Sequence, residues 1–144
     1  MAEGLFNEKN ILKFVVVGEP SVGKSSIINR YIYESENFPV TSPGKIGMEV
    51  HFKRVILRGR ETELQIWDMH GADPCLMGNF SLTRMNGILL VYDVTASESL
   101  GKLESWLKEI ENYTTLASTP RVLVGNKIDL ESERSVERRQ GLKC

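Results

Sequence analysis

Apolar residues occur along this chain in short, nearly unbroken runs. The segments between these runs show helical spacing, strict alternation or mostly polar residues. The runs at 11–17, 87–93 and 121–125 predict buried strands, because strands covered on both faces of a sheet carry few polar positions. Residues 26–32 predict a helix directly after the first strand. The alternation of strands and helices favours an α/β fold with a mostly parallel sheet flanked by helices.

The segment between the first helix and the run at 87 predicts a loop and a β-hairpin. Residues 34–45 are polar and include two prolines and a glycine, which is typical of a loop. Residues 49–58 and 61–68 then predict two strands around a turn at Gly59.

A helix is expected after the third apolar run. Residues 95–98, with the sequence TASE, match a capping box and predict its start. Four apolar residues then recur at helical spacing, and Trp106 beside them is expected in the core. They are Leu100, Leu103, Leu107 and Ile110. Residues 135–143 fit the beginning of one more helix.

Composition narrows the class of protein. A chain of 144 residues fits one domain, and a net charge of −1 gives no support for nucleic-acid binding. Apolar runs stay short of the roughly 18 residues of a membrane helix, and the N-terminus resembles neither a signal peptide nor a myristoylation sequence. Two cysteines, Cys75 and Cys144, indicate a reducing compartment, and Cys144 lacks the C-a-a-X form of a prenylation site. We expect a cytoplasmic protein, with peripheral membrane association left open.

Residues 18–25, GEPSVGKS, match the phosphate-binding pattern G-x-x-x-x-G-K-S between a predicted strand and a predicted helix. The glycines let successive N–H groups turn toward an anion, and the helix adds its positive end. Lys24 supplies a charge for the β- and γ-phosphates, and the Ser25 hydroxyl is placed for Mg²⁺. The sequence therefore predicts a polyphosphate site here.

Two further short motifs extend this site. Asp68 and Gly71 form a D-x-x-G pattern at the end of a predicted strand, where the carboxylate can hold Mg²⁺ and the glycine N–H can approach a terminal phosphate. Residues 126–129, NKID, follow another strand. The Asp129 carboxylate can accept hydrogen bonds from the N1–H and N2–H₂ of guanine, whereas adenine would be repelled. Asn126 can tie this base loop to the phosphate loop, and the Lys127 stem can lie along the base.

In this order and spacing the motifs resemble those of the small GTPases of the Ras superfamily, and residues 87–100 and 106–110 are most similar to the Rab branch. The resemblance covers about residues 13–130. It implies a P-loop NTPase fold and a switch that binds GTP, GDP and Mg²⁺ and that meets effector, exchange and activating proteins. We expect residues 1–12 to be an N-terminal extension and residues 13–144 an incomplete G domain that lacks the final strand and helix.

The resemblance also implies which residues hold the ligands. Mg²⁺ is assigned to Ser25 and Asp68, and no catalytic residue is assigned. The nucleotide is assigned to Ser21, Val22, Gly23, Lys24, Ser25, Ser26, Phe38, Gly71, Asn126, Lys127 and Asp129.

Two departures concern hydrolysis. Lys45 stands where the family has a Mg²⁺-binding threonine. Three alternatives are open: Lys45 contacts the γ-phosphate, Thr41 or Ser42 supplies a substitute hydroxyl, or this loop is simply solvated. Ala72 stands where the family has the glutamine that positions water, so hydrolysis is expected to be slow. His70 is an alternative base, although a solvated loop histidine is the simpler reading.

Two more departures concern the phosphate loop and the end of the chain. Pro20 removes one N–H donor from the loop, and we expect the Glu19 side chain to point away from the phosphates. The family's Ser-Ala-Lys base loop, last strand and last helix have no counterpart before Cys144, which predicts apolar strand surface without its usual cover.

Three functions remain open at this point. The first is a Rab-like switch with slow or impaired hydrolysis. The second is a pseudo-GTPase interaction module that binds nucleotide weakly or not at all, suggested by Lys45 and Ala72. The third, an ATP-dependent P-loop kinase, is disfavoured by the residues at 126–129.

Overall fold

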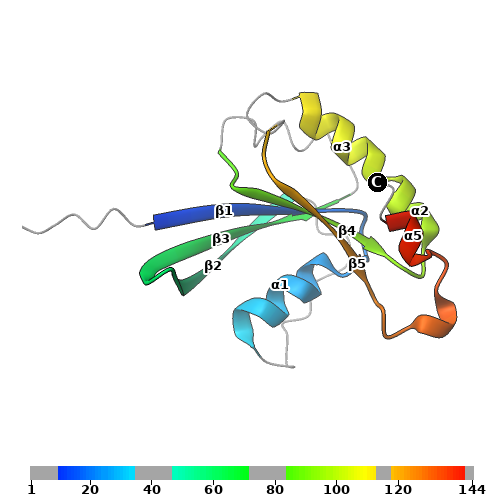
Figure 1. The fold of residues 1–144 in the computed structure, drawn as a ribbon, viewed down its shortest axis with the longest axis horizontal. Helices are drawn as coiled ribbons and strands as arrows, with labels where there is room; N and C mark the ends of the chain where they lie inside the picture. The colour runs from blue at the N-terminus through cyan, green and yellow to red at the C-terminus, as the bar shows by residue number, and fades with distance from the viewer. Residues whose placement is uncertain (1–9, 35–46, 72–83, 113–117, 142–144) are drawn as a thin grey trace, which may run out of the picture.

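The computed structural model describes residues 10–34, 47–71, 84–112 and 118–141 (Figure 1). Most of the predicted loop 34–45 lies outside these ranges. So do several residues on which predictions were made: Phe38, Thr41, Ser42, Lys45, Ala72, Cys75 and Cys144.

The described residues form a sheet of five strands in the order β2-β3-β1-β4-β5. The strands are β1 (Asn10–Val17), β2 (Gly47–Leu57), β3 (Arg60–His70), β4 (Gly87–Asp93) and β5 (Arg121–Asn126). β2 and β3 are antiparallel and form the predicted hairpin, while β3, β1, β4 and β5 run parallel. The predicted α/β class is confirmed, and β1 already begins at Asn10, inside the expected N-terminal extension.

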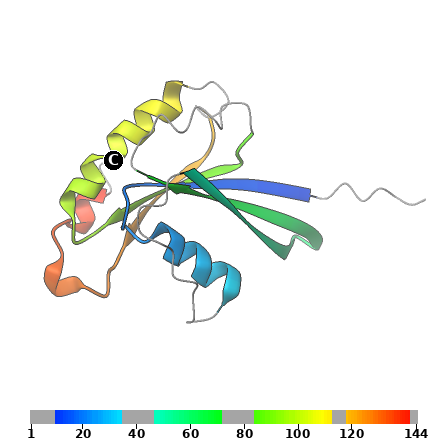
Figure 2. The same cartoon turned by 180° about the vertical axis from the view of Figure 1, so that it is seen from behind.

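Pairing register brings the functional loops to one edge of the sheet. Val16 of β1 pairs with Asp68 of β3, and Asp93 of β4 pairs with Asn126 of β5. Because parallel strands end at the same edge, the phosphate loop after β1 and the base loop after β5 begin there (Figure 2). The register of β1 with β3 brings Asp68 to the same edge.

Helices lie on both faces of this sheet (Figures 1 and 2). α1 (Lys24–Tyr33) contacts β2 and β3 from one side. α2 (Ser97–Gly101) and α3 (Leu103–Asn112) pack against β4 from the other. After β5 come a 3₁₀ turn at Glu131–Glu133 and the short helix α5 (Arg138–Gly141), where a further helix was predicted to begin.

The capping box and the single long helix predicted after residue 95 are both wrong. The N-cap is Ala96, without a side-chain hydrogen bond, and the helix is interrupted at Lys102. The Thr95 hydroxyl instead donates to Asp93 Oδ1 at 2.6 Å. The hydroxyl that the capping box assigned to the helix N-terminus is therefore bound by the Asp93 carboxylate at the end of β4.

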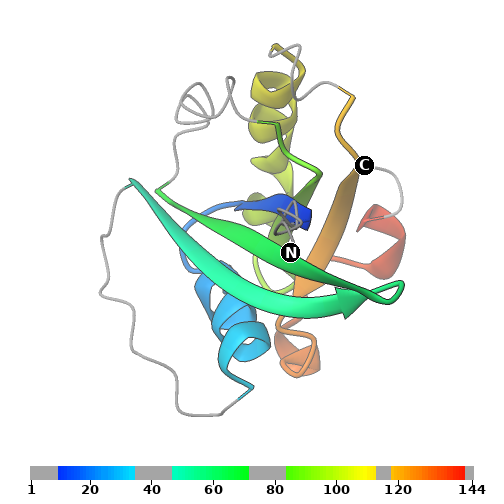
Figure 3. The same ribbon diagram turned by 90° about the vertical axis from the view of Figure 1, so that its left-hand side faces the viewer.

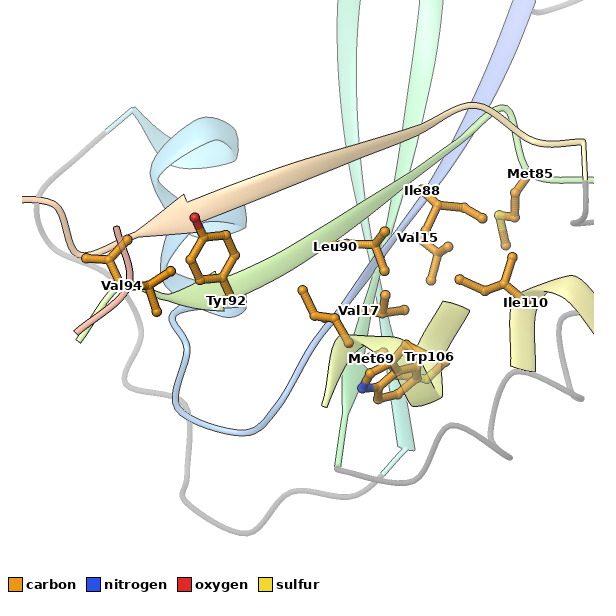
Figure 4. Close-up of a cluster of buried hydrophobic side chains, with 12 residues drawn as sticks. Val15, Val17, Met69, Met85, Ile88, Leu90, Tyr92, Val94, Trp106 and Ile110 are labelled. Atoms are coloured by element: carbon orange, nitrogen blue, oxygen red, sulfur yellow. The ribbon is translucent and has the colours of Figure 1, made fainter. Parts of the chain in front are cut away.

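Two apolar clusters fill the space above and below the sheet. The larger joins Val15 and Val17 to Trp106 and Ile110 on the α3 side, and Trp106 is fully buried as predicted (Figure 4). The smaller places Val16 and Val91 against Val22 and Ile28 on the α1 side. The C-terminal end of β1 is therefore buried on both faces, which fixes the position at which the phosphate loop begins.

Candidate functional site

The phosphate loop runs from the end of β1 into α1. Gly18 and Gly23 have φ angles of +148° and +99°, a region that side chains rarely enter. A Cβ at Gly18 would lie 2.2 Å from the Val91 carbonyl oxygen, and one at Gly23 would lie 2.2 Å from Asn126 Nδ2. Both glycines of the motif are thus required by packing against the β4 backbone and the base loop.

The N-terminus of α1 opens into this loop. Its N-cap is Gly23, which has no side chain to cap the helix. The first N–H groups of a helix have no partner within the helix, so an anion in this loop would bind to them.

Lys24 lies within the loop, with its ammonium group turned back on the backbone. Nζ donates to the carbonyl oxygens of Gly18 at 2.8 Å and Glu19 at 2.7 Å. Burial lowers the pKa of Lys24, while the charges of Asp68 and Glu19 act to raise it. Burial removes hydration from the Lys24 ammonium group. A bound polyphosphate would replace that hydration with charge-assisted hydrogen bonds and so stabilise the charged form of Lys24.

Glu19 extends toward α3 and lies against a cation there. Its carboxylate is 3.6 Å from the Lys102 ammonium group, at the junction of α2 and α3. This contact gives the acidic residue of the phosphate loop a partner.

The two residues assigned to Mg²⁺ meet at the edge of the sheet. The Ser25 hydroxyl donates to Asp68 Oδ2, and Asp68 is fully buried. Its other oxygen, Oδ1, has no hydrogen-bond partner within the part of the chain that the structure describes. A buried carboxylate oxygen without a donor is costly, so it fits a site completed by a cation or its waters. Bound there, Mg²⁺ would neutralise phosphate charge.

Few other protein ligands are available to such a cation. In the described ranges, no group of three or more His, Cys, Asp or Glu side chains is placed to hold a metal ion. A cation held by Ser25 and Asp68 would take its remaining ligands from phosphate and water, as Mg²⁺ commonly does.

The base loop is fastened directly to the phosphate loop. Asn126 Nδ2 donates to the Val22 carbonyl oxygen at 2.8 Å, as the sequence predicted. Lys127 Nζ donates to the Ser21 carbonyl oxygen at 2.7 Å, and Lys127 has a φ angle of +66°. Asp129 follows on the exposed side of the loop, where its carboxylate can reach a ligand.

Asp93, at the end of β4, is a part of the site that sequence reasoning missed. Its Oδ2 lies 2.7 Å from Lys127 Nζ, and Oδ1 accepts hydrogen bonds from the N–H and hydroxyl of Thr95. Burial acts to raise the pKa of Asp93, but the hydrogen bonds from Lys127 and Thr95 outweigh it and lower the pKa below 3.8. Its position at the end of a predicted central strand was the available signal.

The His70 side chain is largely buried and lies close to Asp68, one of the two residues assigned to Mg²⁺. Its Nε2 is 3.4 Å from Glu49 Oε2 on β2 and 3.7 Å from Asp68 Oδ2. Gly71 follows with a φ angle of +107°.

Of the residues predicted to bind nucleotide, all except Phe38 lie in the described ranges. Ser21 to Ser26 form the loop and the first turn of α1, Gly71 follows β3, and the base loop lies beside them. A phosphate loop, a buried Ser–Asp pair and an attached base loop at one edge of a mostly parallel sheet define the class of P-loop nucleotide-binding proteins with a G-domain arrangement.

Comparison with known proteins gives the family. The Ras family model matches residues 13–144, and the chain belongs to that family. It is 38% identical over 133 residues to Ras-related protein Rab-18-B of Danio rerio, covering 92% of this chain and 63% of that protein. It is 36% identical to Ras-related protein Rab-18 of Lymnaea stagnalis, covering 92% of this chain and 64% of that protein. It is 40% identical to Ras-related protein RABC2b of Arabidopsis thaliana, covering 90% of this chain and 63% of that protein. The chain spans slightly less than two thirds of the length of these relatives.

Proposed function

We propose that this protein is a Rab-like molecular switch that binds GTP and GDP with Mg²⁺ and hydrolyses GTP slowly. The observation that carries the proposal is the double connection between the base loop and the phosphate loop, from Asn126 to Val22 and from Lys127 to Ser21. These bonds hold the two recognition elements of one mononucleotide in a fixed relation.

Selectivity for guanine is assigned to Asp129. Its exposed carboxylate stands two residues after Lys127, whose own charge is directed to Asp93 at 2.7 Å. Two hydrogen bonds from guanine to a carboxylate are charge-assisted, and the unprotonated N1 of adenine offers none.

Slow hydrolysis is proposed from the side chain at position 72. Alanine has no polar group to orient a water molecule, and family members with a glutamine rely on that orientation. A protein with this change would remain in the GTP form for longer after each exchange event.

Partners and location follow from the family alone. We propose effector, exchange and activating proteins as partners, with vesicle traffic as the setting, as in the Rab branch. None of the helices in the described ranges is long and apolar enough to cross a membrane. Residues 13–144 are proposed as the G domain.

The direct test is equilibrium titration with fluorescent GDP, with ADP as competitor. We expect GDP binding that millimolar ADP does not displace. Asp129→Asn should weaken GDP binding by about 100-fold, because two charge-assisted hydrogen bonds are worth about 3 kcal/mol or more. Glu131→Gln is the matched control: Glu131 is an exposed acid in the same segment, and its change should leave GDP affinity within about 2-fold.

Three results would contradict the proposal in different ways. No GDP binding by folded protein would favour the pseudo-GTPase module. Displacement by ADP would favour an adenine-nucleotide enzyme. Equal losses in both variants would show that the base is not read by Asp129.

A further inference from the structure

Glu19 is an acidic residue inside a loop that otherwise attracts anions. Its carbonyl oxygen accepts a hydrogen bond from Lys24 Nζ at 2.7 Å, and the charge of its carboxylate acts to raise the pKa of Lys24. The side chain of Glu19 is 16% exposed, so solvent screens this charge only in part. A carboxylate without a counter-charge at this position would oppose the binding of a polyphosphate.

The partner of the Glu19 carboxylate is Lys102, whose ammonium group lies 3.6 Å from Oε2. Lys102 joins α2 to α3, and its backbone is fixed on both sides. Its N–H donates to the Glu98 carbonyl oxygen at 3.0 Å, and its carbonyl oxygen accepts from the Ser105 N–H at 3.1 Å. Figure 3 shows α3 (yellow) and α1 (blue) on opposite faces of the sheet. The ion pair therefore directs the carboxylate toward the α3 side, away from the N-terminus of α1.

The same carboxylate has other donors close to it. The Lys24 ammonium group lies beside the Glu19 backbone, and the first N–H groups of α1 have no partner within the helix. Carboxylates and phosphates bind to the same kinds of donor, ammonium groups and the N–H groups of a helix N-terminus. Without Lys102, the Glu19 side chain could rotate toward these donors and compete with a nucleotide for them.

We propose that Lys102 is a positioning residue for nucleotide binding, which holds the Glu19 carboxylate out of the phosphate site. This inference rests on the nucleotide binding proposed above and adds a residue that lies outside the nucleotide-binding motifs. A movement of the α2–α3 junction that breaks the ion pair would weaken nucleotide binding without any contact between Lys102 and the nucleotide.

The ion pair is tested first in nucleotide-free protein, by cross-linking with a water-soluble carbodiimide. The reagent activates a carboxylate, and a neighbouring amine then displaces the urea and forms an amide, so that only groups in contact are joined. Mass spectrometry of the peptides should find Glu19 joined to Lys102 and not to Lys108, an exposed lysine six positions later on α3. A failure to join Glu19 to Lys102, or an equally frequent link to Lys108, would overturn the proposal.

Titration with fluorescent GDP then measures the coupling between the two residues. Lys102→Met should weaken GDP binding by about 5-fold or more in the parent, but by less than about 2-fold in a Glu19→Gln background, because glutamine has no charge with which to compete. Lys102→Arg should retain the parent affinity, since a guanidinium group preserves the ion pair. Lys108→Met is the matched control: it removes the same charge from an exposed position on α3 and should leave the affinity within about 2-fold.

Two results of the titration would overturn this inference alone. Equal losses from Lys102→Met in both backgrounds would mean that the lysine does not act through Glu19. Equal losses from Lys102→Met and Lys108→Met would mean that only the net charge of the protein matters. Lys102→Gln replaces Lys102→Met if the thermal midpoint of the methionine variant falls below that of the parent. Folded parent protein that binds no GDP would instead overturn the proposed nucleotide binding together with this inference.

Discussion

Lys127 and Asp93 connect the ends of two neighbouring strands through one ion pair of 2.7 Å. The side chain of Asp93 is 9% exposed and that of Lys127 is 32% exposed, so the pair is shielded from solvent mainly at the carboxylate. Lys127 also reaches the Ser21 carbonyl oxygen. The charge on Asp93 therefore positions the lysine that joins the base loop to the phosphate loop.

Asp93→Asn should lower the free energy of unfolding by about 1–2 kcal/mol at pH 7, because a charge-assisted hydrogen bond becomes a neutral one. The folded-state pKa of Asp93 is lowered, so its contribution is present above the ordinary value of 3.8 and is lost as pH falls through the lower folded value. The difference between variant and parent should thus persist unchanged from pH 7 to about pH 5.

Urea unfolding of nucleotide-free protein at several pH values measures this difference, with Asp129→Asn as the control. Asp129 is an exposed carboxylate in the adjacent loop, and its change should leave stability within about 0.5 kcal/mol. A difference that disappears already near pH 5 would mean that the carboxyl group is not stabilised in its charged form.

At the scale of elements, the start of α1 depends on one residue without a side chain. Gly23 combines a φ angle of +99° with contact to Asn126, so the helix N-terminus and the base loop share a single tight junction. Gly101 at the end of α2 differs: a Cβ there would meet nothing within 4 Å.

Gly23→Ala should destabilise the protein by about 1–3 kcal/mol and weaken GDP binding by at least about 10-fold, because both the backbone and Asn126 must move. Gly101→Ala should instead stabilise it by about 0.5–1 kcal/mol through helix propensity, with GDP affinity unchanged. Thermal unfolding and GDP titration of the two variants measure both effects. Similar behaviour of the two alanine variants would refute the assigned role of Gly23.

The sequence was sufficient for the strands and for the loops that follow them. Apolar runs located β1, β4 and β5 to within a residue or two, and short motifs located the phosphate and base loops. The Ala96 N-cap was not predictable, because Thr95 is recruited by Asp93. The apolar spacing that predicted one helix also gave no sign of the interruption at Lys102. The role of Asp93 was missed because it depends on the pairing of β4 with β5, and a local sequence pattern does not contain that pairing.

At the scale of the whole molecule, the sheet assembles one site from segments that are far apart in sequence. Asn126 and Val22, which share a hydrogen bond, are separated by 104 positions along the chain. The phosphate and base elements are therefore available only in the folded protein, and bound nucleotide should stabilise that fold.

We propose that slow hydrolysis distinguishes this chain from family members with a glutamine after the D-x-x-G glycine, because position 72 is alanine here. Single-turnover GTP hydrolysis should be slow in the parent protein, and Ala72→Gln should accelerate it by about 10-fold or more, because an amide can orient the attacking water. Ala72→Ser is a control, since its short hydroxyl should give little gain. A parent rate equal to that of Ala72→Gln would contradict slow hydrolysis without affecting nucleotide binding.

The most direct test of the central claim is to denature freshly purified protein and identify the released nucleotide by mass spectrometry. The account predicts guanine nucleotide at close to one per chain, with GTP retained alongside GDP. Protein that is folded yet releases no nucleotide, or that releases adenine nucleotide, would contradict it.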